Sequence, residues 1–119
     1  MATIYVIEDC LITQNLIMDI LQANGALCLG CRRVDEALQT MPVAPPDLII
    51  LEPLTDQRRG FKFFHEVRQN PKTEYVPIVL ITAAAKASVR DLLETAGGPT
   101  LYRSKPYDPN ELVAIAQAL

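Results

Sequence analysis

The sequence predicts one α/β domain in which helices cover both faces of a doubly wound, mainly parallel β-sheet. Short apolar segments alternate with amphipathic segments five times along the 119 residues. The segments 48–51 and 78–81 are apolar without alternation, as expected of strands that are covered on both faces. The connections between segments are short, which favours parallel strands joined by crossover helices in three layers. We expect residues 1–119 to form this single domain.

The first half of the chain contains three predicted strands and two predicted helices. Residues 4–7 and 26–29 are short apolar runs that predict the first two strands, and 48–51 predicts the third. A helix is predicted over 11–23, ending at Gly25. Its apolar stripe is expected at Ile12, Leu16 and Ile20. A short second helix is marked by Val34, Leu38 and Met41 and ends at Pro42, Pro45 and Pro46.

The second half repeats the alternation. A third helix is expected to begin at Gly60 and to end at Asn70-Pro71, before the strand at 78–81. A fourth helix carries Val89, Leu92, Leu93 and Ala96 and stops at Gly97-Gly98-Pro99, followed by a short strand at 101–103. The last helix has a clear start, with Asp108 as its cap, Pro109 in the first position and Glu111 three residues after the cap. Its buried stripe is expected at Leu112, Ile115 and Leu119.

Composition excludes several classes of protein. The net charge is −3 with scattered basic residues, which argues against a nucleic-acid-binding surface. No apolar run approaches the ~20 residues of a membrane span, and the N-terminus does not resemble a leader peptide. The three cysteines suit a reducing compartment, so we expect a cytoplasmic protein.

Polar residues with chemical potential follow the predicted strands. In parallel sheets a site forms where the carboxyl ends of the strands meet. Glu8 and Asp9 follow the first strand, Glu52 the third, Thr82 the fourth and Lys105 the fifth. Crowded carboxylates need a cation, which is either the Lys105 ammonium or a divalent metal; oxygen ligands favour Mg²⁺. These groups also suit phosphoryl transfer, although for any single residue a plain salt bridge is the simpler interpretation.

Five sequence blocks occur in order along the chain: Ile7-Glu8-Asp9, Pro46 to Glu52, Gly60, Pro77 to Ala83, and Tyr102 to Pro106. In these blocks and in the spacing between them, the chain resembles the response-regulator receiver domain of two-component signalling. The resemblance implies a flavodoxin-like (CheY-like) sheet in the strand order 2-1-3-4-5 with five helices. It makes Glu8, Asp9, the phosphoacceptor position at Glu52 and the main-chain carbonyl of Leu54 the Mg²⁺ ligands. It makes Thr82 the hydroxyl that contacts a phosphoryl group, Lys105 the conserved-type lysine before a proline often joined by a cis bond, and Thr82 with Tyr102 the switch pair.

The chain departs from this family where the chemistry would occur. Glu52 stands where the family carries aspartate, and one extra methylene moves the carboxylate by ~1.5 Å. The loop from Pro53 to Gly60 also differs, because Asp56 and Arg59 stand where the family has a proline and an acid. Cys10 replaces a frequent third acid. We expect any Mg²⁺ binding to be weak or absent.

Three hypotheses for Glu52 stay open: it mimics the phosphorylated state, it is an inert partner of Lys105, or it accepts phosphate slowly. We expect a signalling module rather than an enzyme. Its partner would bind the face formed by the fourth helix, fifth strand and fifth helix, which carries Arg90, Tyr102 and Arg103. A histidine kinase or phosphotransfer protein is the expected upstream partner if phosphorylation survives, and a homodimer stays open. A Mg²⁺-dependent phosphohydrolase and a flavin or nucleotide carrier are the alternatives, but the chain lacks room for a cap and has no glycine-rich phosphate loop.

Three further features have simpler interpretations. The Cys28-x-x-Cys31 spacing is expected to reflect core packing, because no second ligand pair accompanies it. His65 has no histidine or cysteine near it in the sequence and is expected at the edge of the core. Asp56 is expected to be a solvated loop acid, with a role as a substitute site carboxylate as the alternative.

Overall fold

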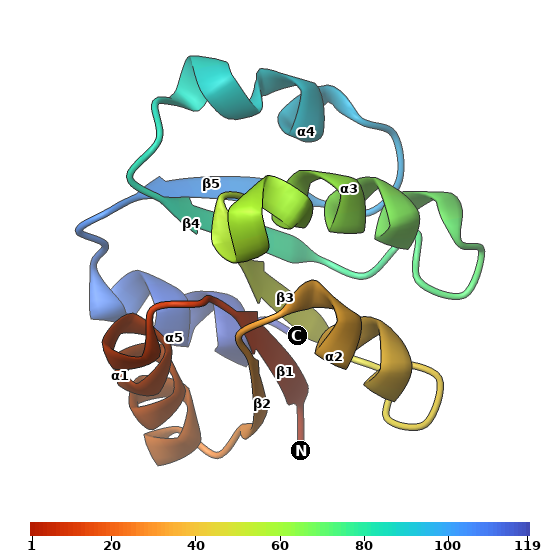
Figure 1. Ribbon diagram of the computed structural model, residues 1–119. Helices are drawn as coiled ribbons and strands as arrows, with labels where there is room; N and C mark the ends of the chain where they lie inside the picture. Colours follow the sequence, from red (N-terminus) through yellow and green to blue (C-terminus); the bar gives the residue numbers. More distant parts are fainter.

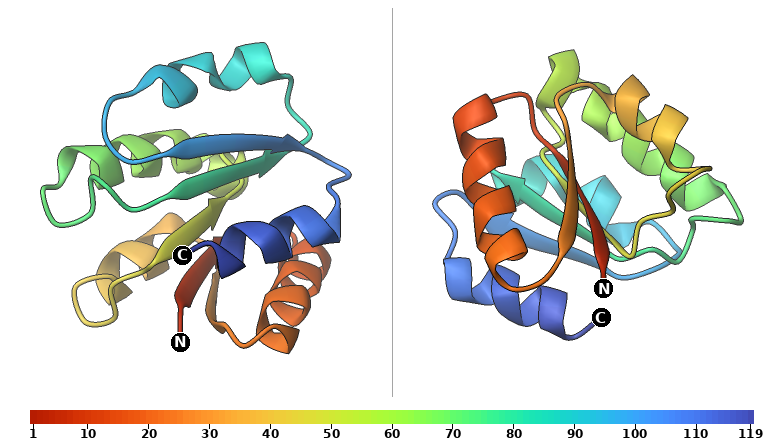
Figure 2. Two further views of the ribbon diagram at one scale, coloured as in Figure 1. Left: turned by 180° about the vertical axis from the view of Figure 1, so that it is seen from behind. Right: turned by 90° about the horizontal axis from the view of Figure 1, so that it is seen from below.

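A computed structural model describes residues 1–119 and shows a five-stranded parallel sheet in the order β2-β1-β3-β4-β5. The predicted fold class and strand order are therefore confirmed. α2, α3 and α4 cover one face of the sheet, and α1 and α5 cover the other (Figures 1 and 2). The strands are β1 Thr3–Ile7, β2 Leu27–Cys31, β3 Leu48–Leu51, β4 Ile78–Thr82 and β5 Thr100–Ser104. The helices are α1 Leu11–Ala23, α2 Val34–Thr40, α3 Thr55–Gln69, α4 Arg90–Glu94 and α5 Pro109–Gln117.

The central strands alternate between two hydrophobic cores. On β1, Tyr5 and Ile7 face the core under α2 to α4, and Ile4 and Val6 face the core under α1 and α5. Every residue of β3 and β4 is buried. This burial on both faces explains why the two strands read as continuous apolar runs.

The predicted stripe of α1 is wrong. Ile12 is 82% exposed and Leu16 is 54% exposed, and the buried residues of this helix are Gln14, Ile17 and Leu21. The helix lies so close to β2 that a Cβ atom on Gly30 would be 2.7 Å from both Gln14 Oε1 and Met18 Sδ. With α1 in this orientation, Gln14 and Ile17 point inward, and Ile12 and Leu16 are exposed to solvent.

The ends of three helices differ from expectation. α3 begins at Thr55, five residues before the predicted start at Gly60, and its first turn contains three left-handed residues, Asp56 to Arg58. The predicted fourth helix is divided into a 3₁₀ turn, Lys86–Val89, and the short α4. The cap at Asp108 is confirmed by its hydrogen bond from the Asn110 amide at 2.9 Å, but α5 ends at Gln117 and Leu119 is 49% exposed. None of the helices combines the length and hydropathy that a membrane span requires.

Arg68 on α3 ties together the loops that precede β4 and β5. Its side chain is buried without a carboxylate partner, and its guanidinium donates hydrogen bonds to the carbonyls of Glu74, Val76 and Pro99 at 3.0, 2.6 and 2.9 Å and to Thr100 Oγ1 at 3.0 Å. Gly97 allows this contact, because a Cβ there would lie 2.8 Å from Arg68 Cδ. The backbone thus supplies all the acceptors but one.

We predict that Arg68→Met lowers the free energy of unfolding by about 3 kcal/mol or more, because it leaves buried carbonyls without donors. Urea denaturation measures the change. Arg90→Met, which removes the same charge from an exposed position, is the control and should change stability by less than about 0.5 kcal/mol. Equal effects of the two substitutions would contradict a stabilising role for the hydrogen bonds of Arg68.

Candidate functional site

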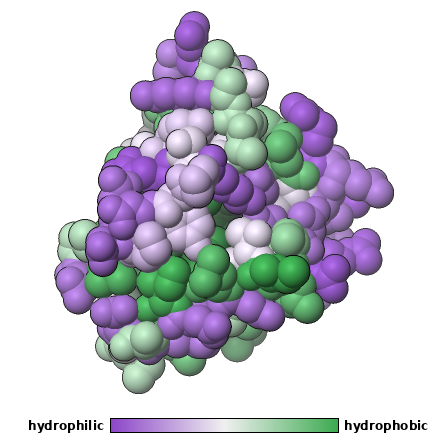
Figure 3. Space-filling view, turned by 90° about the vertical axis from the view of Figure 1, so that its left-hand side faces the viewer, coloured by the Kyte–Doolittle hydropathy of each residue, from purple (hydrophilic) through white to green (hydrophobic).

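The carboxyl edge of the sheet brings together three of the residues singled out from the sequence. Glu8 follows β1, Glu52 follows β3 and Lys105 follows β5. Figure 3 views this side of the molecule, where hydrophilic side chains surround a central hollow. Hydrophobic side chains form a row below it. Leu11 and Ile12, the first two residues of α1, are exposed. The predicted convergence of acid and ammonium groups is therefore observed.

Lys105 forms an ion pair with two buried carboxylates at once. Its Nζ donates to Glu8 Oε1 at 2.6 Å and to Glu52 Oε1 at 3.2 Å. The side chains of Glu8 and Glu52 are 5% and 8% exposed, and that of Lys105 is 25% exposed. Partial burial opposes the charged form of Lys105, but the hydrogen bonds and charges of Glu8 and Glu52 outweigh it and raise the pKa of the ammonium. The Lys105–Pro106 peptide bond is cis, as the resemblance implies.

The remaining carboxylate oxygens of these two acids are also satisfied. Glu8 Oε2 accepts the Cys10 amide at 3.3 Å, and Glu52 Oε2 accepts the Leu54 amide at 3.3 Å. Gln14 on α1 donates to the Glu8 carbonyl at 3.1 Å. Buried acids are tolerated because each has both a counter-charge and a backbone donor.

Asp9 faces away from this triad toward the loop after β3. Its Oδ2 accepts the Asp56 amide at 3.1 Å, its own amide donates to Thr55 Oγ1 at 3.3 Å, and its carbonyl accepts from Arg32 Nε at 3.3 Å. Asp9 is exposed, unlike Glu8 and Glu52. The acidic pair that is adjacent in the sequence thus has two different sets of partners.

Asp56 is a structural residue that the sequence did not reveal. Its Oδ2 accepts the amide of Val34, the first residue of α2, at 3.2 Å, and its Oδ1 pairs with Arg59 at 2.9 Å. Some burial opposes the charged form of Asp56, but these partners outweigh it and lower the pKa of the carboxyl. The expected solvated loop acid is therefore wrong. One indication in the sequence was Arg33 before α2, because arginine does not cap a helix and the first amides of α2 therefore needed an acceptor from elsewhere in the chain.

A left-handed turn produces this placement of Asp56. Asp56, Gln57 and Arg58 have φ values of 57°, 58° and 69°. In this left-handed conformation, each residue other than glycine is destabilised by roughly 1–2 kcal/mol. Gly60 follows because a Cβ there would lie 2.6 Å from the Pro53 carbonyl oxygen. The bonds of Asp56 to Asp9, Val34 and Arg59 offset the strain.

The side chains of the predicted switch pair, Thr82 and Tyr102, form no hydrogen bond with the side chains of Glu8, Glu52 or Lys105. Thr82 is fully buried, and its Oγ1 accepts the Ala84 amide at 3.1 Å. The Tyr102 hydroxyl donates to the Ala84 carbonyl at 2.8 Å, and its ring packs against the core under α2 to α4. The Thr82 hydroxyl forms no hydrogen bond with Glu52 or Lys105, although the Thr82 carbonyl accepts the Lys105 amide at 3.0 Å. Thr82 and Tyr102 therefore share the residue Ala84 at the start of the β4–α4 loop.

The residues that the resemblance assigns to Mg²⁺ do not form a ligand set. No group of three or more His, Cys, Asp or Glu side chains in the protein is arranged to hold a metal ion. Lys105 lies between Glu8 and Glu52, and Asp9 bonds to the Asp56 amide. The Leu54 carbonyl accepts the Arg58 amide at 3.1 Å, within the left-handed turn. The side chains present fit an ammonium ion rather than a divalent cation.

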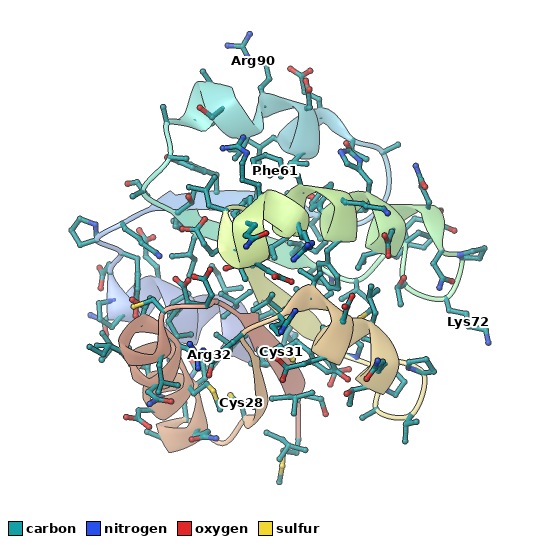
Figure 4. The ribbon with its side chains drawn as sticks, in the orientation of Figure 1. Cys28, Cys31, Arg32, Phe61, Lys72 and Arg90 are labelled. Carbon is teal, nitrogen blue, oxygen red and sulfur yellow. The ribbon has the colours of Figure 1, made fainter.

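The two cysteines of the C-x-x-C spacing lie in different cores. Cys31 packs under α2 to α4 and Cys28 packs against the core under α1 and α5, so the two thiols cannot form one site (both are labelled in Figure 4). Burial raises the pKa of the Cys31 thiol to about 11. His65 is half-buried, with its ring edge-on to Phe64 at 5.6 Å between centroids. The simpler interpretations of both features agree with the structure.

Two curated relatives are similar over nearly all of the chain. An uncharacterised 14.6-kDa protein of Leptolyngbya boryana is 30% identical over 96% of this chain and 86% of its own length. The phosphate regulon transcriptional regulatory protein PhoB of Escherichia coli (strain K12) is 30% identical over 98% of this chain and 50% of its own. The chain thus spans about half the length of its PhoB relatives.

A solved structure and a family match agree with these relatives. The receiver domain of the sensor histidine kinase PA1611 from Pseudomonas aeruginosa, solved with a magnesium ion coordinated in its active site cleft, superimposes with a TM-score of 0.83 at 25% identity, covering 98% of this chain and 95% of its own. Residues 4–117 match the response regulator receiver domain family.

We predict that Lys105→Met lowers the free energy of unfolding by about 2–4 kcal/mol, because it leaves two buried carboxylates without a counter-charge. Denaturant unfolding at neutral pH measures the loss. In the double variant Lys105→Met/Glu8→Gln one of the two charges is also removed, so part of the stability should return. If the loss of stability in the double variant equalled the sum of the losses in Lys105→Met and Glu8→Gln, the ion pair would not be the cause.

We predict that Asp56 makes the protein more sensitive to acid. A carboxyl with a lowered pKa contributes stability above its unfolded pKa near 3.8, and the contribution disappears as the pH falls through the folded value. Asp56→Asn should therefore lower stability at neutral pH and make it depend less steeply on pH below about 4. Parallel pH profiles of unfolding for the two proteins would contradict this assignment. Asp91→Asn, on the exposed surface of α4, is the control.

Proposed function

Because the chain belongs to the response-regulator receiver domain family of two-component signalling, we propose that it is a receiver that signals without being phosphorylated. The observation that carries the proposal is the 3.2 Å ion pair between Glu52 and Lys105. Glu52 already supplies a negative charge to the lysine, at the position where the family carries its acceptor aspartate. Both oxygens of Glu52 accept hydrogen bonds, one from Lys105 Nζ and one from the Leu54 amide, and these bonds fix the orientation of the carboxylate.

The position of Tyr102 supports a fixed signalling conformation. Its hydroxyl bonds to Ala84 in the β4–α4 loop, and its ring packs on the core. The resemblance implies that the ring at this position moves between exposed and buried positions as the threonine engages the phosphoryl group. Here Thr82 bonds to Ala84 as well, so both groups hold the loop from the same residue. The inward position of the Tyr102 ring supports Glu52 as a permanent substitute for the phosphoryl charge. The alternative, an inert salt-bridge partner of Lys105, is supported by the Thr82 hydroxyl, which forms its hydrogen bond with Ala84 and not with Glu52.

The proposed partner surface is the face formed by α4, β5 and α5. It exposes Arg90 and Leu101, and Arg103 is held there by an ion pair with Glu111 at 2.6 Å. Basic side chains beside an apolar one suit a signalling protein with an acidic, partly apolar contact. The protein would transmit its signal through this contact and would carry out no reaction of its own.

We predict that the wild type gains no phosphoryl group when incubated with a small acyl phosphate and Mg²⁺, as measured by intact mass. Glu52→Asp withdraws the carboxylate by about 1.5 Å and restores the acceptor type of the family. Labelling of this variant alone would support a receiver with a disabled acceptor. A stable adduct on Glu52 of the wild type would overturn the proposal, and Glu52→Gln is the control for labelling elsewhere.

A further inference from the structure

The space between Glu8 and Glu52 already contains a cation. Lys105 Nζ lies 2.6 and 3.2 Å from one oxygen of each acid, and both acids are almost fully buried. A divalent ion that used the same two oxygens would have to lie next to the ammonium or displace it. The first arrangement places three positive charges together, and their repulsion in a partly buried site is large.

The other expected metal ligands are held by the backbone of the loop after β3. Asp9 Oδ2 accepts the Asp56 amide, and the Leu54 carbonyl accepts the Arg58 amide. Both bonds belong to the left-handed turn, which is also fastened to α2 through Asp56 and Val34. An ion that used Asp9 Oδ2 or the Leu54 carbonyl oxygen would compete with these amide hydrogen bonds.

We infer that Lys105 is the resident cation of this pocket and that it excludes divalent metal ions. The inference deepens the proposed function, because a pocket neutralised by its own side chain holds one state whatever the concentration of free Mg²⁺. Mg²⁺ gives up its hydration water reluctantly and demands near-octahedral oxygen ligands. The Lys105 ammonium is covalently attached to the chain and needs no octahedral set of oxygen ligands, so it occupies the pocket in preference to Mg²⁺.

The test is titration with Mn²⁺, which broadens the NMR signals of amides near its binding site, on the wild type and on Lys105→Met. We expect no saturable broadening at Glu8, Asp9 and Glu52 in the wild type. Lys105→Met retains the length of the side chain without the charge, and should bind Mn²⁺ at least about tenfold more tightly. Arg103→Met, which removes the same charge from β5 outside the pocket, is the matched control and should behave as the wild type.

Each outcome decides the inference. Saturable broadening around Glu8 and Glu52 in the wild type would overturn it, and so would a folded Lys105→Met that binds no better than Arg103→Met. The NMR spectrum itself reports whether Lys105→Met is folded; if it is not, Lys105→Gln, which can still donate to one acid, takes its place. Failure of the proposed function would look different: a wild type that excludes Mn²⁺ and still gains a phosphoryl group disproves only that proposal, whereas one that binds Mn²⁺ without labelling disproves only this inference.

Discussion

The pocket depends on one ammonium group shared by two buried carboxylates. Each of the three side chains comes from the end of a different strand, so the network connects β1, β3 and β5 across the carboxyl edge of the sheet. Buried acids are unfavourable alone, and two of them close together are worse. Lys105 therefore determines both that Glu8 and Glu52 can be buried and where their oxygens point.

The loop after β3 shows a second consequence of this arrangement. The loop is organised by Asp56, which bonds to Asp9 through its amide and to α2 through its carboxylate. The three left-handed residues are unfavourable on their own and persist because the surrounding contacts require them. The pocket is thus held in place by the contacts of Asp56 with α2 as well as by the ion pairs at the strand ends.

The fold could be predicted from the sequence because the strongest signals, the apolar runs at β3 and β4, are also the most buried elements. The rotation of α1 could not, since it depends on how closely Gln14 and Met18 approach Gly30. In the site, the convergence of Glu8, Glu52 and Lys105 followed from their places after the strands. Two features did not follow. The separate role of Asp9 and the capping role of Asp56 both depend on a left-handed turn of residues that rarely adopt one, and no local pattern signals it.

The hydrogen bonds of Arg68 give the two rims of the sheet different structural roles. At the amino rim, one guanidinium gathers three carbonyls from two loops, and Gly97 and Gly98 leave no room for side chains. Substitutions there affect the framework on which every strand is aligned. The carboxyl rim carries the charged residues on a framework that is already secured. A replacement at the amino rim would therefore disturb the loops that lead into β4 and β5, whereas a replacement at the carboxyl rim would act first on the charges of the pocket.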